Sequence, residues 1–138
     1  FIGPRYQISA RYELAINGAR EMQSSSGIIV STGLGSTGWL KSIVAGAAGI
    51  FNQTRIDTSL PWDADQLKYA VREPFPSQMT GTTLVYGDIT ADSRMQVASL
   101  MSGHGVIFSD GMVDDFIEFN SGAIVELSMA KSAGRIVC

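Results

Sequence analysis

The sequence of 138 residues predicts a mainly β fold, an antiparallel β-sandwich-like domain with one main α-helix. Three observations lead to this prediction. Many short strand-like segments alternate with turn signals, a single segment has apolar residues at helical spacing, and a loop rich in Gly, Ser and Thr precedes that segment. The alternation of strands and helices that builds a doubly wound parallel sheet is not found.

The first third of the chain is predicted to form a hairpin, a buried strand and a helix. Residues 6–16 have strand-like content, and Asn17-Gly18 is a strong hairpin turn signal before a return strand at 20–23. Residues 28–31 form an apolar run typical of a buried strand. From Ser36 onward, positions 40, 43, 44, 47, 50 and 51 are apolar and predict a helix, which Ser36 or Thr37 could cap and Asn52 could end.

The remainder of the chain is predicted to be β-rich after a polar connection over residues 52–66. Turn signals such as Gly87-Asp88 and Asp110-Gly111 separate the candidate strands. These strands are expected at residues 67–72, 82–86, 95–100, 106–109, 116–119, 123–128 and 135–137.

Composition and charge argue against several classes of protein. A net charge of −3 without a basic stripe argues against nucleic-acid binding, and no apolar stretch reaches membrane-spanning length. Cys138 is the sole cysteine, which excludes an internal disulfide and a cysteine-cluster metal site. The length predicts a single domain over residues 1–138. Because the chain begins at Phe1 with no leader-like segment, we expect a fragment of a longer protein.

The segment from Ser31 to Trp39, Ser-Thr-Gly-Leu-Gly-Ser-Thr-Gly-Trp, is the most informative for function. Its glycines permit close approach of a ligand to the backbone, and its hydroxyls can donate and accept hydrogen bonds. A helix start at this point favours an anionic or strongly polar ligand. The residues alone leave three readings open: a nucleotide-binding loop, a purely structural glycine turn, and a Rossmann G-x-G-x-x-G loop with Asp57 near the expected acidic position. Trp39 could stack on a flat ring or pack in the core.

Other polar residues point to no catalytic centre. The lone His104 between two glycines is read as an exposed loop histidine, Asp114-Asp115 as a solvated turn, and Arg72-Glu73 as a surface ion pair. With a single histidine in the sequence, we predict no Ser/His/Asp catalytic triad. No metal site is predicted.

Several of these segments resemble the NAD kinase family, specifically its C-terminal, β-rich domain. The run from Ser31 to Trp39 is similar to the family's Ser-Thr-x-x-Gly-Ser-Thr-Ala-Tyr loop between a strand and a helix. The hairpin at 13–18 and the strand with an Asp-Gly step at 106–111 also look like that domain. Residues 69–74, residues 119–124 and Trp39 in place of tyrosine suit the divergent branch that includes mitochondrial-type NAD kinases.

The resemblance implies a substrate-binding domain of an enzyme that phosphorylates the 2′-hydroxyl of the adenosine ribose of NAD to give NADP. ATP would be the phosphoryl donor, with Mg²⁺ as the metal. The family's catalytic aspartate lies in a Gly-Gly-Asp-Gly segment of an N-terminal α/β domain. No such segment occurs here, so this chain contributes no catalytic residue and is expected to be inactive alone. A non-catalytic nucleotide-sensing module, or less favoured a Rossmann oxidoreductase domain, remains an alternative.

By resemblance, the start of the helix contacts NAD and the preceding loop shapes the site. Ser26 stands where the family usually has aspartate, which is a departure from its pattern. The family also implies a homo-oligomer, a cytoplasmic location and a small-molecule nucleotide as partner. The predicted cofactor-binding residues are Ser31, Thr32, Gly35, Ser36, Thr37, Gly38, Trp39, Ser42 and Asp110.

Overall fold

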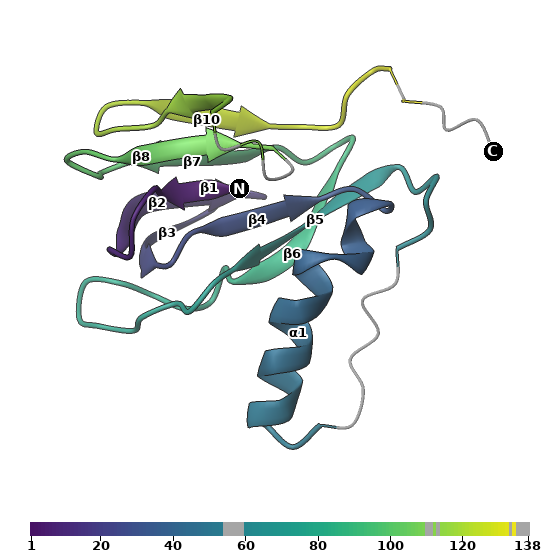
Figure 1. Ribbon diagram of the computed structural model, residues 1–138, viewed down its shortest axis with the longest axis horizontal. Helices are drawn as coiled ribbons and strands as arrows, with labels where there is room; N and C mark the ends of the chain where they lie inside the picture. The colour runs from purple at the N-terminus through teal and green to yellow at the C-terminus, as the bar shows by residue number, and fades with distance from the viewer. Residues whose placement is uncertain (54–59, 110–111, 113, 133, 135–138) are drawn as a thin grey trace.

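Two antiparallel sheets and one helix make up the described part of the chain (Figure 1). The computed structural model describes residues 1–53, 60–109, 112, 114–132 and 134. Every strand pair within these residues is antiparallel, which confirms the predicted mainly β class. The same finding rules out the Rossmann alternative, because that fold needs a mostly parallel sheet.

The larger sheet has six strands in the order β6-β5-β4-β1-β8-β9. In that order the strands span Tyr86–Thr90, Gln66–Val71, Ile28–Ser31, Ile2–Pro4, Gly105–Phe108 and Phe116–Glu118. The smaller sheet has four strands in the order β10-β7-β2-β3. They span Ile124–Leu127, Met95–Ser99, Ala10–Ile16 and Ala19–Ser25.

A tight turn joins β2 to β3, as the Asn-Gly signal predicts. Asn17 and Gly18 have φ values of 51° and 79°, the left-handed conformations that a two-residue hairpin of this type requires. The turn sets the register so that Ile16 pairs with Ala19 and Ala10 with Ser25. The strand predicted over residues 6–16 starts later in the structure, where β2 begins at Ala10.

Side chains of both sheets share one hydrophobic core. Alternate residues of β2 are buried, and Leu14 of β2 and Val97 of β7 are fully inaccessible to solvent. Tyr69 and Ile28 of the larger sheet belong to the same cluster. Removing each such side chain from water stabilises the fold by about 1.5–3 kcal/mol.

One polar pair lies inside this core. The hydroxyls of Tyr12 and Ser25 share a hydrogen bond of 2.7 Å across β2 and β3. Burial raises the pKa of the Tyr12 hydroxyl, and the hydrogen bond with Ser25 offsets only part of this rise. The tyrosine therefore remains neutral and hydrogen-bonded, as a buried polar group must.

Helix α1 (Trp39–Ile50) packs on the outer face of the larger sheet and projects beyond it (Figure 1). Leu40, Val44 and Ala48 form its buried stripe at a spacing of four residues. Leu40 packs against Ile29 of β4 and Ala70 of β5, whose neighbours in sequence face the core between the sheets. The larger sheet is thus covered on both faces near the helix.

The helix begins and ends in different ways. Neither Ser36 nor Thr37 caps it: residues Gly35–Thr37 form a 3₁₀ turn (η1), Gly38 is the N-cap, and no side chain caps this end. The C-terminal prediction is confirmed, since Asn52 has a φ of 53°. The Asn52 N–H donates to the Gly49 carbonyl at 3.3 Å and the Gln53 N–H to the Ala48 carbonyl at 2.9 Å, a Schellman ending.

Strand β6 differs from the prediction. Residues 82–86 are predicted as a strand ended by a Gly87-Asp88 turn, but β6 spans Tyr86–Thr90 and includes both residues. Gly87 lies opposite Tyr69, whose ring leaves no room for a side chain there, and Asp88 pairs with Lys68 at 2.6 Å. The glycine thus serves close packing within the sheet instead of a turn.

Strand β1 is not predicted at all, because three residues carry little periodic signal. The predicted strand at 135–137 lies outside the described residues. No helix in the described part of the chain has the length and apolar character needed to cross a bilayer.

Candidate functional site

The loop between β4 and α1 is held by its own hydroxyl groups. Ser36 Oγ donates to the Gly33 carbonyl at 2.7 Å, and Thr37 Oγ1 donates to the Leu34 carbonyl at 3.3 Å. Both residues lie within η1, and Gly38 occupies the N-cap position of α1, so neither hydroxyl stands where it could cap the helix. Ser31 Oγ donates to the Thr32 carbonyl at 3.0 Å, and Thr32 Oγ1 accepts from the Gly35 N–H at 3.3 Å. Ser31 and Ser36 are buried, whereas Thr32 and Thr37 remain exposed.

The loop glycines have different roles. A Cβ on Gly33 would lie 1.9 Å from the Pro61 carbonyl oxygen, so this glycine allows the loop to touch the segment before β5. A Cβ on Gly35 would meet the Ser31 hydroxyl at 2.9 Å, and one on Gly38 would meet the Gly35 carbonyl at 3.5 Å. Close backbone packing thus accounts for Gly33, while Gly35 and Gly38 are exposed at the loop surface.

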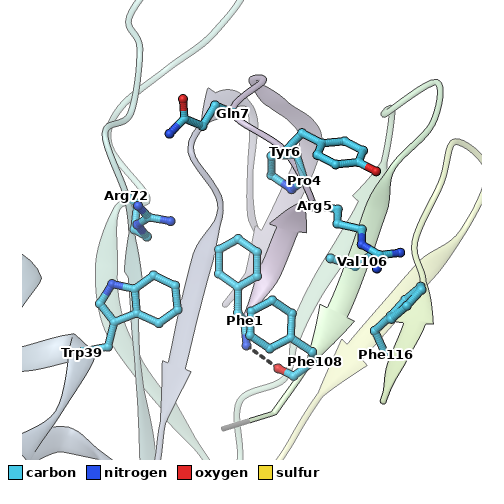
Figure 2. A pocket seen from close by; sticks show the side chains of 10 residues that line it. All are labelled: Phe1, Pro4, Arg5, Tyr6, Gln7, Trp39, Arg72, Val106, Phe108 and Phe116. Atoms are coloured by element: carbon cyan, nitrogen blue, oxygen red, sulfur yellow. Dashed lines mark hydrogen bonds between the residues drawn. The ribbon is translucent and has the colours of Figure 1, made fainter. Parts of the chain in front are cut away.

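Trp39, the first residue of α1, stands in a group of stacked side chains (Figure 2). Its ring lies 5.5 Å from the Phe1 ring, with only 13° between their planes. The Arg72 guanidinium lies 4.8 Å from the centroid of the Trp39 ring. Phe108 contacts the other side of this group, with its ring 5.0 Å from that of Phe1.

This group forms one wall of a cavity of about 510 Å³, here called the aromatic cavity (Figure 2). The volume lies in the usual range for small-molecule sites. Residues from β1, the segment after it, α1, the end of β5, β8 and β9 surround it. They are Phe1, Pro4, Arg5, Tyr6, Gln7, Trp39, Arg72, Val106, Phe108 and Phe116.

A second cavity of about 450 Å³, the α1 groove, runs along the helix. Trp39 and Arg72 line both cavities and so stand between them. Ser42 lines the α1 groove one turn further along the helix. The stacked pair of Trp39 and Arg72 is therefore the point at which the two cavities meet.

The structure brings only part of the predicted site to these cavities. Trp39 and Ser42 are among the lining residues. The loop residues before the helix lie next to Trp39 in sequence but line neither cavity; they are Ser31, Thr32, Gly35, Ser36, Thr37 and Gly38. Asp110 lies outside the described residues, as does Asp57 of the Rossmann reading.

Sequence reasoning missed several cavity residues. Phe1, Arg5 and Phe116 carry no motif and meet only through the sheet order. Arg72 was expected in a surface ion pair with Glu73, but each side chain has another partner. Arg72 stacks on Trp39 and donates from Nη1 to the Ser26 carbonyl at 3.3 Å, whereas Glu73 accepts a hydrogen bond from the Ser26 hydroxyl.

His104 agrees with its interpretation as an exposed loop histidine. His104 is exposed with a φ of 62°, and its ring meets that of Tyr6 edge-on at 4.9 Å. The described residues contain no group of three or more His, Cys, Asp or Glu side chains that could hold a metal ion.

Comparison with known proteins supports the fold assignment. No protein-family model and no curated protein matches this sequence. A crystal structure of an NAD kinase from Archaeoglobus fulgidus in complex with ATP is similar to this chain, with a TM-score of 0.61 at 14% sequence identity. The match covers 94% of this chain and 43% of that kinase chain, so this chain spans less than half of its neighbour's length. The chain therefore has an NAD kinase-like fold.

Proposed function

We propose that this chain is the substrate-binding domain of an NAD kinase-like enzyme that transfers a phosphoryl group from ATP to the 2′-hydroxyl of NAD. The observation that carries the proposal is the position of Trp39, which is 45% exposed at the helix start and lines both cavities. A dinucleotide has two planar bases, each attached to a ribose, and a pyrophosphate joins the two riboses. Such a ligand suits adjoining cavities with a shared aromatic wall. The fold and the resemblance of the loop support the same assignment.

The residues of this chain would bind and orient NAD. Phosphoryl transfer depends mainly on positioning and charge stabilisation, which a rigid loop and an uncapped helix start can supply. The internal bonds of Ser36 and Thr37 hold that loop in one conformation. We assign to Ser36 a positioning role, and to Trp39 and Ser42 direct contact with the ligand.

A carboxylate lies beside Ser26 although the sequence lacks the family's usual aspartate there. The Ser26 hydroxyl donates to the Glu73 carboxylate, which comes from the segment after β5. Glu73 has a φ of 48°, a strained conformation for this residue type. We infer that Glu73 takes over the acidic role at this position, consistent with membership of the divergent, mitochondrial-type branch.

The catalytic base and the metal would come from elsewhere. The described residues do not fit a Mg²⁺ site of their own, because they offer no cluster of carboxylates. No step through a metal is therefore assigned to this chain. The base would belong to an N-terminal α/β domain of the intact protein, and assembly would be homo-oligomeric in the cytoplasm.

Calorimetric titration of the intact protein with NAD tests the proposal. Trp39→Ala should weaken NAD binding by about tenfold, as expected for loss of a stacking partner. Trp62→Ala is the matched control: Trp62 is 69% exposed and lines neither cavity, so its removal should leave affinity unchanged. No NAD binding by the intact protein, or equal affinity in both variants, would contradict the proposed site.

A kinase assay separates this proposal from a nucleotide-sensing module. The intact protein should form NADP from NAD and ATP, whereas the 138 residues alone should not. An intact protein that binds NAD without forming NADP would favour the sensor. NADP formation by the 138 residues alone would place the base within this chain and overturn the assignment.

A further inference from the structure

Two arginine guanidinium groups lie over aromatic rings in the aromatic cavity. Arg72 lies 4.8 Å from the centroid of Trp39, and Arg5 lies 4.8 Å from the centroid of Phe116. Figure 2 shows the two guanidinium groups on opposite sides of Phe1. A guanidinium stacked on a ring keeps its N–H edges available for hydrogen bonds, because stacking uses only its face.

Neither arginine has a carboxylate partner within the described residues. The ion pairs found there join Arg20 to Glu13, Lys68 to Asp88 and Arg94 to Glu126. Among the described residues, no acidic side chain lines the aromatic cavity. Two positive charges are thus concentrated in one cavity of a chain whose net charge is −3.

Both arginines are anchored by polar contacts that leave hydrogen-bonding capacity. Nη1 of Arg72 donates to the Ser26 carbonyl at 3.3 Å, one of the five N–H groups that a guanidinium carries. The backbone N–H of Arg5 donates to the His104 carbonyl at 2.8 Å, which fixes the start of this side chain. The forked N–H geometry of arginine matches the oxygens of a phosphate group.

We propose that Arg5 and Arg72 bind the phosphate groups of a nucleotide whose planar ring packs against the aromatic side chains of this cavity. The aromatic walls favour a nucleotide over inorganic phosphate, and the volume of about 510 Å³ accommodates one. This inference rests on the proposed function, because it assigns the phosphate contacts of the same nucleotide site. The phosphates could belong to NAD or to ATP, and the experiment distinguishes these sources.

The experiment measures the affinity of each ligand by isothermal titration calorimetry. Adenosine, ADP, NAD, ATP and sodium pyrophosphate are titrated separately into the intact protein. Arg72→Gln and Arg5→Gln should each weaken binding of the phosphate-bearing ligand by roughly tenfold to a hundredfold, and leave adenosine unaffected. Each variant should also reduce the dependence of affinity on salt, because an ion contact is lost.

Lys41→Gln is the matched control for a general charge effect. Lys41 is exposed on the same helix as Trp39 and lines neither cavity. Its substitution should therefore leave all ligand affinities within twofold of wild type. Arg72→Lys keeps the charge but loses the fork, and its affinity should lie between those of wild type and Arg72→Gln. Thermal unfolding of each variant identifies any that fails to fold, in which case Arg72→Lys and Arg5→Gln carry the test.

The outcomes separate the two proposals. A loss confined to NAD assigns the cavity to the phosphate acceptor, and a loss confined to ATP assigns it to the donor; both support the inference. Pyrophosphate or ADP binding that the arginine variants abolish supports the inference even if NAD fails to bind, while that failure contradicts the proposed function. Glutamine variants that leave the affinities for NAD, ATP, ADP and pyrophosphate all unchanged overturn the inference alone.

Discussion

The hydroxyl of Ser36 lies 2.7 Å from the Gly33 carbonyl oxygen and is almost completely buried, with 3% of the residue exposed. This bond joins the two ends of the turn that precedes α1. Because Ser36 is buried, its side chain stabilises the loop instead of facing the solvent.

Ser36→Ala should lower the free energy of unfolding by about 1 kcal/mol, since a buried hydrogen bond is lost. Urea denaturation measures this change. Thr37→Val is the matched control, because the exposed Thr37 bond is longer at 3.3 Å and its loss should change stability by less than about 0.5 kcal/mol. Equal destabilisation by the two substitutions would show that the Ser36 bond has no special role in the loop.

Gly33→Ala should destabilise the protein by roughly 1–3 kcal/mol, because the added methyl would meet the backbone of Pro61. Gly49→Ala is the comparison: nothing lies within 4 Å of a Cβ there, and alanine favours the helix by about 0.5–1 kcal/mol. Thermal unfolding should therefore shift in opposite directions for the two variants. A stable Gly33→Ala protein would mean that the loop and the Pro61 segment move apart easily.

Glu21 connects β3 to the segment before β6, and its ionisation should contribute to stability. Its carboxylate accepts from the Thr83 N–H at 2.9 Å and from the Leu84 N–H at 3.1 Å. Burial alone would raise the pKa of Glu21, but hydrogen bonds from Gln23, Thr83 and Leu84 outweigh it and hold the pKa below its ordinary value. The stabilisation is therefore complete above the ordinary value of about pH 4, and is lost as pH falls through the lower folded-state value.

Glu21→Gln should cost about 1 kcal/mol at neutral pH, and the difference from wild type should disappear in acid. Denaturant unfolding across a pH series measures both effects. Glu13→Gln, which removes an exposed pair with Arg20, should have little effect at any pH. A constant difference between Glu21→Gln and wild type down to low pH would show that the charge is not responsible.

Local signals predicted the elements whose structure depends on neighbours in sequence. The Asn17-Gly18 turn, β4 and the helical stripe through Leu40 and Val44 all follow from such signals. The predicted Gly87-Asp88 turn was wrong. Both residues lie in β6, where Gly87 is opposite Tyr69 and the tyrosine ring leaves no room for a side chain. Tertiary context overrides a turn preference in such a case.

The candidate site was only partly predictable for the same reason. Trp39 and Ser42 were predicted from the resemblance to the NAD kinase family, but Arg5, Arg72 and Phe116 reach the aromatic cavity from separate elements. Cation–π contacts leave no spacing pattern in a sequence. The predicted helix cap was wrong because a 3₁₀ turn takes up Ser36 and Thr37 and leaves Gly38 at the N-cap position.

Strand β1 lies inside the larger sheet between β4 and β8, where Ile2 pairs with Ile28 on one side and Ile107 on the other. The order in which a ribosome releases the chain therefore matters for this sheet. Among the described strands of this sheet, β1 comes first in sequence, and its edge toward β8 stays unpaired until β8 has been synthesised. Such distant pairing slows folding, and an open edge in the meantime is a place where nascent chains can associate.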